Sequence, residues 1–334
     1  LLHVKKELLK EIVPKALRLW DVNPKKISLP LQSENAVFKI EDSNGNNFAL
    51  RISKEDRHHL SKFNSEYLWM SYLAERGLVV PRAMLSIKNK VFEKIEGVTS
   101  SETVLACLLS WLEGRQLSSL LSGFKKKDAQ QIYKSLGKVI ANLHEAAVEW
   151  DVPKEFSRPS FDVDGLLGET PLWGKFWEVR SIDSGDRMEL SLIKDKLKIA
   201  LEGLGKEDDL FGIIHADLHS ENILVNNEDL AIIDFDNLAF GWFGFDLAGA
   251  LWDRLDVSAN GGHFETAQEA MIEGYLQERP DAHEIINSIP VFLLMRTLML
   301  ISWIDNRPEL GYKNYLPELV NASKTQAKNL NLLI

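Results

Sequence analysis

The chain has 334 residues, of which 45% are hydrophobic and 26% are charged, and this balance is typical of a soluble globular protein and excludes a disordered or collagen-like one. Its length favours two domains or one large two-lobed unit. The formal net charge of -10 repels phosphate backbones and anionic lipids, so neither nucleic acid nor a membrane is expected as a partner.

The first hundred residues predict a small lobe of mixed helices and strands. Residues 1–13 alternate charged and apolar residues at helical spacing and lack the unbroken apolar core of a signal peptide. Two strands are expected at 36–41 and 47–52, because Asn44-Gly45 between them is a strong hairpin signal. A helix is expected from Arg57 to Arg76, ending at Gly77.

Further strands are expected near residues 83–87, 91–95 and 103–109. The last of these contains Cys107, the single cysteine of the chain, within an apolar run. A lone cysteine cannot form a disulfide within the chain, so we expect a buried thiol and a cytoplasmic location.

Long helical patterns dominate the sequence after Glu113-Gly114, and the pattern at 128–145 is the clearest. They are interrupted between Phe211 and Ile233 by two short apolar runs with a polar loop between them. The apolar segment Val291–Ile304 contains an arginine and is expected to be a buried helix that is too short to span a bilayer.

The segment between Phe211 and Ile233 carries the residues best suited to catalysis and metal binding. Asp217 is followed five positions later by Asn222, and Asp234 ends the second apolar run. Phosphoryl transfer requires a carboxylate that orients the acceptor hydroxyl and takes its proton, together with oxygen ligands for Mg²⁺. Asp217 fits the first role, and Asn222 and Asp234 fit the second.

This pattern, His-x-Asp-x-x-x-x-Asn followed by Ile-Asp-Phe-Asp, resembles the catalytic and metal loops of the aminoglycoside phosphotransferase and choline kinase-like phosphotransferase enzyme family, which is related to the protein kinases. The resemblance implies an α+β, bilobal protein-kinase-like fold. It divides the chain into a small N-terminal lobe with an antiparallel sheet (residues 1–112) and a larger helical C-terminal lobe (113–334).

The resemblance also assigns the nucleotide-binding residues of the first half. Phe-Ala-Leu-Arg, ending at Arg51, stands where kinases carry Val-Ala-Ile-Lys, and Glu66 follows in the next helix as the partner acid. Arg51 replaces the usual lysine but can still bind phosphate oxygens. The other cofactor-binding residues that the resemblance implies are Ser33 and Asn35 in a phosphate-covering loop, Ala49, and Trp111 and Leu112 between the lobes.

Five further residues are candidates for contact with substrate or for support of the catalytic loop: His215, Asp236, Asp246, Trp252 and Arg254. His215 is expected to brace the loop from a buried position, and Asp246 resembles a family residue with the same role. Asp236 fits either a metal or substrate contact or a turn cap. The helical half, where relatives bind the acceptor, contains Trp252, Asp253, Arg254, Arg296, Trp303 and Asp305, although packing or surface solvation is the simpler interpretation of each.

The implied activity is transfer of the γ-phosphate of ATP, with Mg²⁺, to a hydroxyl of a small molecule such as an aminoglycoside, an amino alcohol, a hydroxy amino acid or a sugar. Three alternatives stay open: a protein Ser/Thr kinase of the bacterial stress-response type, a catalytically silent nucleotide-binding scaffold, and a hydrolase that binds zinc or manganese through His215, Asp217 and His219. No oligomeric state follows from the sequence.

Overall fold

The computed structural model describes residues 6–32, 36–54, 57–96, 103–227, 229–255 and 262–333. Contacts divide the chain into two compact units. The N-terminal unit consists of Leu1–Gly114, Val152–Ser157 and Ala231–Asp236, and the helical unit contains the remaining residues. The predicted domain boundary after residue 112 stays a prediction.

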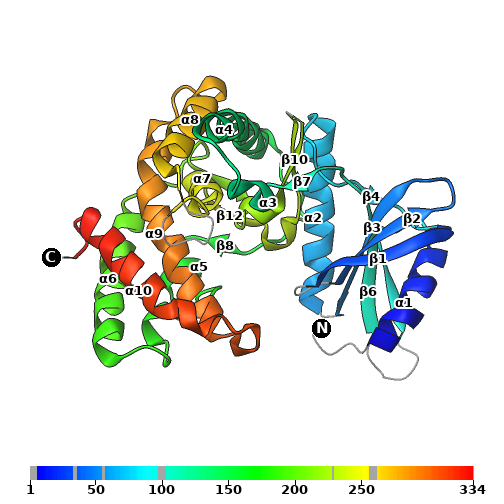
Figure 1. Cartoon of the computed structure of the whole chain (residues 1–334), viewed down its shortest axis with the longest axis horizontal. Coiled ribbons are helices and arrows are strands. Elements are labelled where there is room, and N and C mark those ends of the chain that lie inside the picture. The colour runs from blue at the N-terminus through cyan, green and yellow to red at the C-terminus, as the bar shows by residue number, and fades with distance from the viewer. Residues whose placement is uncertain are drawn as a thin grey trace. The chain divides into compact units, whose positions relative to one another are not determined.

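The N-terminal unit is built on an antiparallel sheet with the strand order β1-β2-β3-β6-β4, in which β5 also pairs with β6 (Figure 1). The strands are β1 (Pro24–Gln32), β2 (Ala36–Asp42), β3 (Asn47–Lys54), β4 (Ala83–Met84), β5 (Phe92–Glu96) and β6 (Thr103–Ser110). The predicted hairpin at Asn44-Gly45 is confirmed. Asp42 Oδ1 accepts the backbone N–H of Asn44 and of Asn46, and Gly45 adopts a φ of 87°, which a side chain would disfavour.

Each face of this sheet packs against one helix. Leu50 and Ile52 of β3 are fully buried in a cluster that includes residues of α1 (Lys6–Arg18). The opposite face packs against Phe63 of α2 (Arg57–Glu75), beside the buried thiol of Cys107. The alternation of side chains along β3 therefore directs Arg51 toward α2.

The helical unit contains eight α-helices in its described residues: α3 (Ser118–Leu121), α4 (Lys126–Glu149), α5 (Val163–Leu167), α6 (Ser184–Glu202), α7 (Phe243–Trp252), α8 (Phe264–Glu278), α9 (His283–Asp305) and α10 (Leu316–Asn329). Its short strands are β7 (Arg115–Gln116), β8 (Ser160–Phe161), β9 (Phe211–Ile214), β10 (Ile223–Asn226) and β12 (Ala239–Trp242). β10 pairs with β7, and β12 pairs with both β8 and β9. β11 (Asp229–Ile232) carries the chain from this unit back into the N-terminal one.

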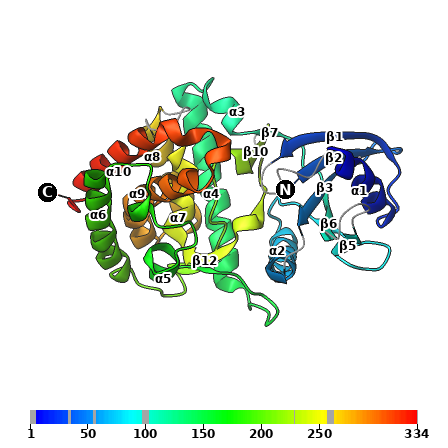
Figure 2. The ribbon, with the colours of Figure 1, turned by 90° about the horizontal axis from the view of Figure 1, so that it is seen from below.

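Helix α9 is longer than the sequence suggested. It has 23 residues and is long and apolar enough to cross a membrane, so the expectation that this segment is too short was wrong. The predicted burial is confirmed, because 72% of its most apolar window lies inside the protein. Figure 2 shows α9 among the other helices of its unit, where it packs against α7 and α10.

Helices α4 and α8 lie side by side and approach each other through glycines (Figures 1 and 2). A Cβ atom on Gly137 of α4 would overlap the carbonyl oxygen of Met271 in α8. A Cβ atom on Gly274 of α8 would likewise overlap the carbonyl oxygen of Lys134. The two backbones are therefore closer together than any residue with a side chain permits.

We expect Gly137→Ala to lower the free energy of unfolding by about 1–3 kcal/mol, because the new methyl group forces two packed helices apart. The measurement is urea unfolding followed by circular dichroism. Gly123→Ala is the control, since a Cβ there meets its nearest atom at an ordinary 3.6 Å. Equal loss of stability in both variants would contradict the close helix contact.

Candidate active site

The loop that joins β9 to β10 carries the predicted catalytic residue Asp217 and the predicted metal ligand Asn222. Asp217 is the third residue after β9, and its side chain is 16% exposed. Arg296 Nη2 lies 2.7 Å from its Oδ1, and Asn237 Nδ2 donates a hydrogen bond of 3.1 Å to its Oδ2. His219 Nε2 lies 3.7 Å from the same Oδ2. The carboxylate is thus surrounded by a cation and polar groups of its own unit.

These neighbours keep Asp217 ionised. Burial alone would raise the pKa of the carboxyl, but the positive charge of Arg296, with a smaller effect of His219, outweighs burial and lowers the pKa below its usual range. A carboxylate that stays charged at neutral pH can accept a proton from a hydroxyl that is bound next to it.

Asp246 holds the beginning of this loop in place. It lies in the first turn of α7 and is fully buried, and its two carboxylate oxygens accept the backbone N–H groups of His215 at 2.8 Å and Ala216 at 2.9 Å. Ala216 adopts a φ of 64°, a left-handed conformation that costs energy for a residue with a side chain. The two hydrogen bonds offset that cost and fix the position from which Asp217 projects.

A buried histidine and a tyrosine support Asp246 in turn. His144 Nε2 lies 3.4 Å from Asp246 Oδ2, and its Nδ1 lies 2.8 Å from the hydroxyl of Tyr275. Burial lowers the pKa of His144, although Asp246 acts to raise it. The neutral ring therefore donates from Nε2 to Asp246 and accepts the Tyr275 hydroxyl at Nδ1. No local sequence pattern indicated this pair, because His144 lies 102 positions from Asp246 and 131 positions from Tyr275.

His215 and Asn222 complete the loop. His215 is fully buried, and its Nδ1 accepts the backbone N–H of Asp217 at 3.3 Å. The side-chain nitrogen of Asn222 donates to the backbone carbonyl of Asp217 at 2.9 Å. This bond fixes the orientation of the amide, so that its oxygen is the atom suited to bind a metal ion.

The second predicted metal ligand belongs to the other unit. Asp234 follows β11, has a φ of 64° and is exposed. An exposed carboxylate and an oriented amide oxygen are each hard oxygen donors of the kind that Mg²⁺ binds. The part of the chain that the structure describes contains no cluster of three or more His, Cys, Asp or Glu side chains able to hold a metal.

Arg51 and Glu66 form a buried two-pronged ion pair within the N-terminal unit. Arg51 Nη1 donates to Oε1 of Glu66 at 2.8 Å, and Nη2 donates to Oε2 at 2.7 Å. Burial acts to lower the pKa of Arg51, but Glu66 and, with a smaller effect, Asp236 outweigh it, and the pKa is raised. The guanidinium carbon also lies 4.4 Å from the centre of the Phe63 ring.

The remaining candidates fall into three groups. Ala49 lies two residues before Arg51 on the same face of β3, and Trp111 and Leu112 follow β6, with Lys39 Nζ 4.3 Å from the centre of the Trp111 ring. Trp252 donates to the hydroxyl of Thr297 at 3.0 Å, and Arg254 is buried and donates to the carbonyl of Gly262 at 2.7 Å. Ser33 and Asn35 lie outside the described residues.

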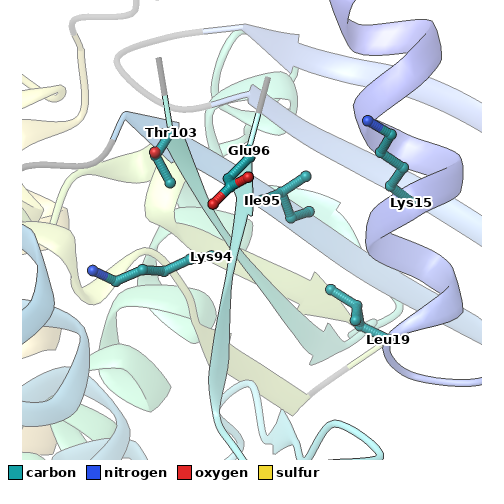
Figure 3. Close-up of a pocket in the computed structure, with 6 residues that line it drawn as sticks. All are labelled: Lys15, Leu19, Lys94, Ile95, Glu96 and Thr103. Atoms are coloured by element: carbon teal, nitrogen blue, oxygen red, sulfur yellow. The ribbon is translucent and has the colours of Figure 1, made fainter. Parts of the chain in front are cut away.

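A shallow hollow in the N-terminal unit contains none of these residues (Figure 3). It lies on the α1 side of the sheet, whereas the ion pair of Arg51 and Glu66 lies on the α2 side. The residues that line it are Lys15, Leu19, Lys94, Ile95, Glu96 and Thr103.

Comparison with known proteins agrees with the motif analysis. The model of the phosphotransferase enzyme family matches residues 28–284. The amicoumacin kinase of Bacillus subtilis (strain 168) is 22% identical over 90% of this chain and 86% of its own length. A homoserine kinase of Rhizobium rhizogenes is 28% identical over 66% of this chain, and the match spans 62% of that enzyme.

Solved structures share the fold. A microcompartment-associated aminopropanol kinase is 24% identical, with a TM-score of 0.81 over 97% of this chain and 99% of its own. An amicoumacin kinase solved with AMP-PNP, Ca²⁺ and Ami is 20% identical, with a TM-score of 0.76 over 94% of this chain and 93% of its own. The prediction of an α+β, protein-kinase-like fold is confirmed.

The positive charge of Arg296 beside Asp217 predicts how the pH dependence of kcat/KM changes when Arg296 is replaced. Without this cation the pKa of Asp217 rises, because the positive charge that stabilises the carboxylate is lost, so protonation disables the carboxylate at a higher pH. We therefore expect the acidic limb of kcat/KM to move to higher pH in Arg296→Gln. The measurement is a profile of phosphoryl transfer between about pH 4 and pH 8.

Arg187→Gln is the control for this profile. It removes the same charge from the same unit, but Arg187 lies in α6 and donates to the carbonyl of Ile182. An acidic limb that moves equally in both variants, or in neither, would contradict the assigned ion pair.

Proposed function

Because the chain belongs to the phosphotransferase enzyme family, we propose that it transfers the γ-phosphate of ATP to a hydroxyl group of a small molecule. The observation that carries this proposal is the carboxylate of Asp217, which pairs with Arg296 and accepts a hydrogen bond from Asn237, and which follows two backbone groups that Asp246 holds in place. A fixed, charged carboxylate is the group that orients and deprotonates a hydroxyl in phosphoryl transfer.

Three predictions made from the sequence are confirmed at the level of the family. The chain belongs to the family that its motifs resemble, it is a kinase, and its cofactors are ATP and a divalent cation of the Mg²⁺ kind. The identity of the acceptor and the roles of individual residues are part of the present proposal.

We assign the roles as follows. Asp217 orients the acceptor hydroxyl and takes its proton, while Asn222 and Asp234 hold Mg²⁺, which when bound neutralises charge on the phosphate oxygens. Arg51, kept in position by Glu66, binds phosphate oxygens as the counterpart of the kinase lysine. Asp246, His144 and Tyr275 fix the loop and do not touch the reacting atoms.

A small acceptor is favoured over a protein acceptor by the relatives. The proteins named above are kinases for amicoumacin, homoserine or aminopropanol, as their names state, and each of these acceptors is a small molecule. The two units correspond, in this proposal, to the two lobes of a kinase. The assay below distinguishes this proposal from two alternatives, a protein Ser/Thr kinase and a nucleotide-binding scaffold without catalytic activity.

The assay is coupled ADP release with Mg-ATP and a panel of aminoglycosides, amino alcohols, hydroxy amino acids and sugars. At least one compound is expected to stimulate ADP release. Stimulation by protein mixtures and by none of the small compounds would favour a protein kinase. ATP binding without ADP release under any condition would favour the scaffold.

We expect Asp217→Asn to lower kcat by about 10²–10⁴-fold, because an amide cannot take the proton of the hydroxyl. ATP binding, measured by calorimetry, should stay close to that of the parent protein. Asp195→Asn is the matched control, since Asp195 is an exposed aspartate of α6. A near-normal kcat in Asp217→Asn would show that another residue acts as the base.

A further inference from the structure

The end of α7 holds the second half of the loop between β9 and β10. Asp253 is the C-cap residue of this helix, and its Oδ2 accepts the backbone N–H of Ser220 at 2.8 Å. Ser220 is buried and begins a short 3-10 turn, Ser220–Asn222. The first N–H groups of a helical turn have no partner within the turn, so a buried one needs an acceptor from elsewhere. Asp253 supplies that acceptor from 33 positions away.

The loop lies along one face of α7. Asp246 accepts the N–H groups at the start of the loop, and Asp253, seven residues later, accepts one near its end. Seven residues are about two turns of an α-helix, so both carboxylates face the same side. Between them, a Cβ atom on Gly249 would lie 3.2 Å from the carbonyl oxygen of Leu218. One carboxylate therefore anchors the loop before Asp217, and the other anchors it after.

The turn that Asp253 holds carries the predicted metal ligand Asn222. The backbone N–H of Asn222 donates to the carbonyl of His219 at 2.9 Å, and its side-chain nitrogen donates to the carbonyl of Asp217. These bonds orient the amide relative to its own loop. Ser220 lies two residues earlier in the same turn, so its bond to Asp253 fixes the position of the amide oxygen relative to α7.

We propose that Asp253 is a positioning residue for Mg²⁺, because it holds, through the N–H of Ser220, the turn from which the oxygen of Asn222 binds the metal. This inference rests on the proposed function, in which Asn222 is a metal ligand. Helix α7 then serves two parts of the site, since Asp246 places the base and Asp253 places a metal ligand. Removal of a group that holds a metal ligand lowers metal affinity by about 10- to 100-fold.

The test measures metal binding directly, without turnover. Mn²⁺ is the probe in place of Mg²⁺, and electron paramagnetic resonance gives its dissociation constant from the complex of the protein with AMP-PNP. Asp253→Ala removes the acceptor of the Ser220 N–H, and we expect it to raise this constant by about 10- to 100-fold. Asp253→Asn keeps an acceptor oxygen in the same place and should recover most of the lost affinity.

Two further readouts separate metal positioning from a general loss of structure. The affinity for AMP-PNP without divalent metal should be the same in the parent protein and in both variants. The Mg²⁺ concentration that gives half-maximal ADP release should rise in Asp253→Ala by the same factor as the Mn²⁺ constant, and excess Mg²⁺ should restore most of kcat. A partly unfolded variant would lose amplitude instead.

Asp183→Ala is the matched control. Asp183 is the N-cap residue of α6 in the same unit, and its side chain likewise accepts one backbone N–H, that of Asp186 at 2.8 Å. The control removes the same charge and should leave Mn²⁺ binding unchanged. Asp253→Glu replaces Asp253→Ala if the latter does not fold, because one added methylene group displaces the carboxylate and should also weaken Mn²⁺ binding.

Several results would overturn the inference and leave the proposed function standing. One is an Mn²⁺ constant that Asp253→Ala leaves unchanged. Another is an equal loss of affinity in Asp253→Ala and Asp183→Ala, or in Asp253→Ala and Asp253→Asn, which would assign the effect to charge and not to the hydrogen bond. A parent protein that binds no Mn²⁺ in the presence of AMP-PNP would overturn the proposed function, and this inference with it.

Discussion

The structure of the candidate site depends on one buried carboxylate that accepts two backbone N–H groups. Asp246 bonds to the amides of His215 and Ala216, and so holds a left-handed residue that the chain would otherwise avoid. Asp217 follows directly, so α7 sets its position together with the bonds from His215 and Asn222 within the loop. His144 and Tyr275 extend this support into α4 and α8, whose glycine contact brings the two helices close together.

A second constraint concerns charge. The chain is strongly acidic, yet Asp217 lies beside an arginine that enters from an apolar helix. This pair lowers the pKa of Asp217 at the place where a base is required.

Local signals in the sequence predicted the elements that depend on local chemistry. Asn44-Gly45 indicated the hairpin, and Gly77 indicated the end of α2. β1 was missed because its two prolines argue against a strand, and the structure places this strand at the edge of the sheet, where prolines are tolerated. The motif supplied Asp217 and Asn222, but the contact of Arg296 with Asp217 joins residues 79 positions apart on separate elements, and no local pattern encodes it.

The central claim is that the γ-phosphate of ATP passes to a hydroxyl oxygen. Phosphorus NMR of a reaction with Mg-ATP and the acceptor that stimulates ADP release tests it most directly, because the chemical shift identifies the atom to which phosphate is attached. The account predicts that the γ-phosphate signal declines as a phosphomonoester signal appears in equal amount. Inorganic phosphate alone, or a phosphorus–nitrogen product, would contradict it.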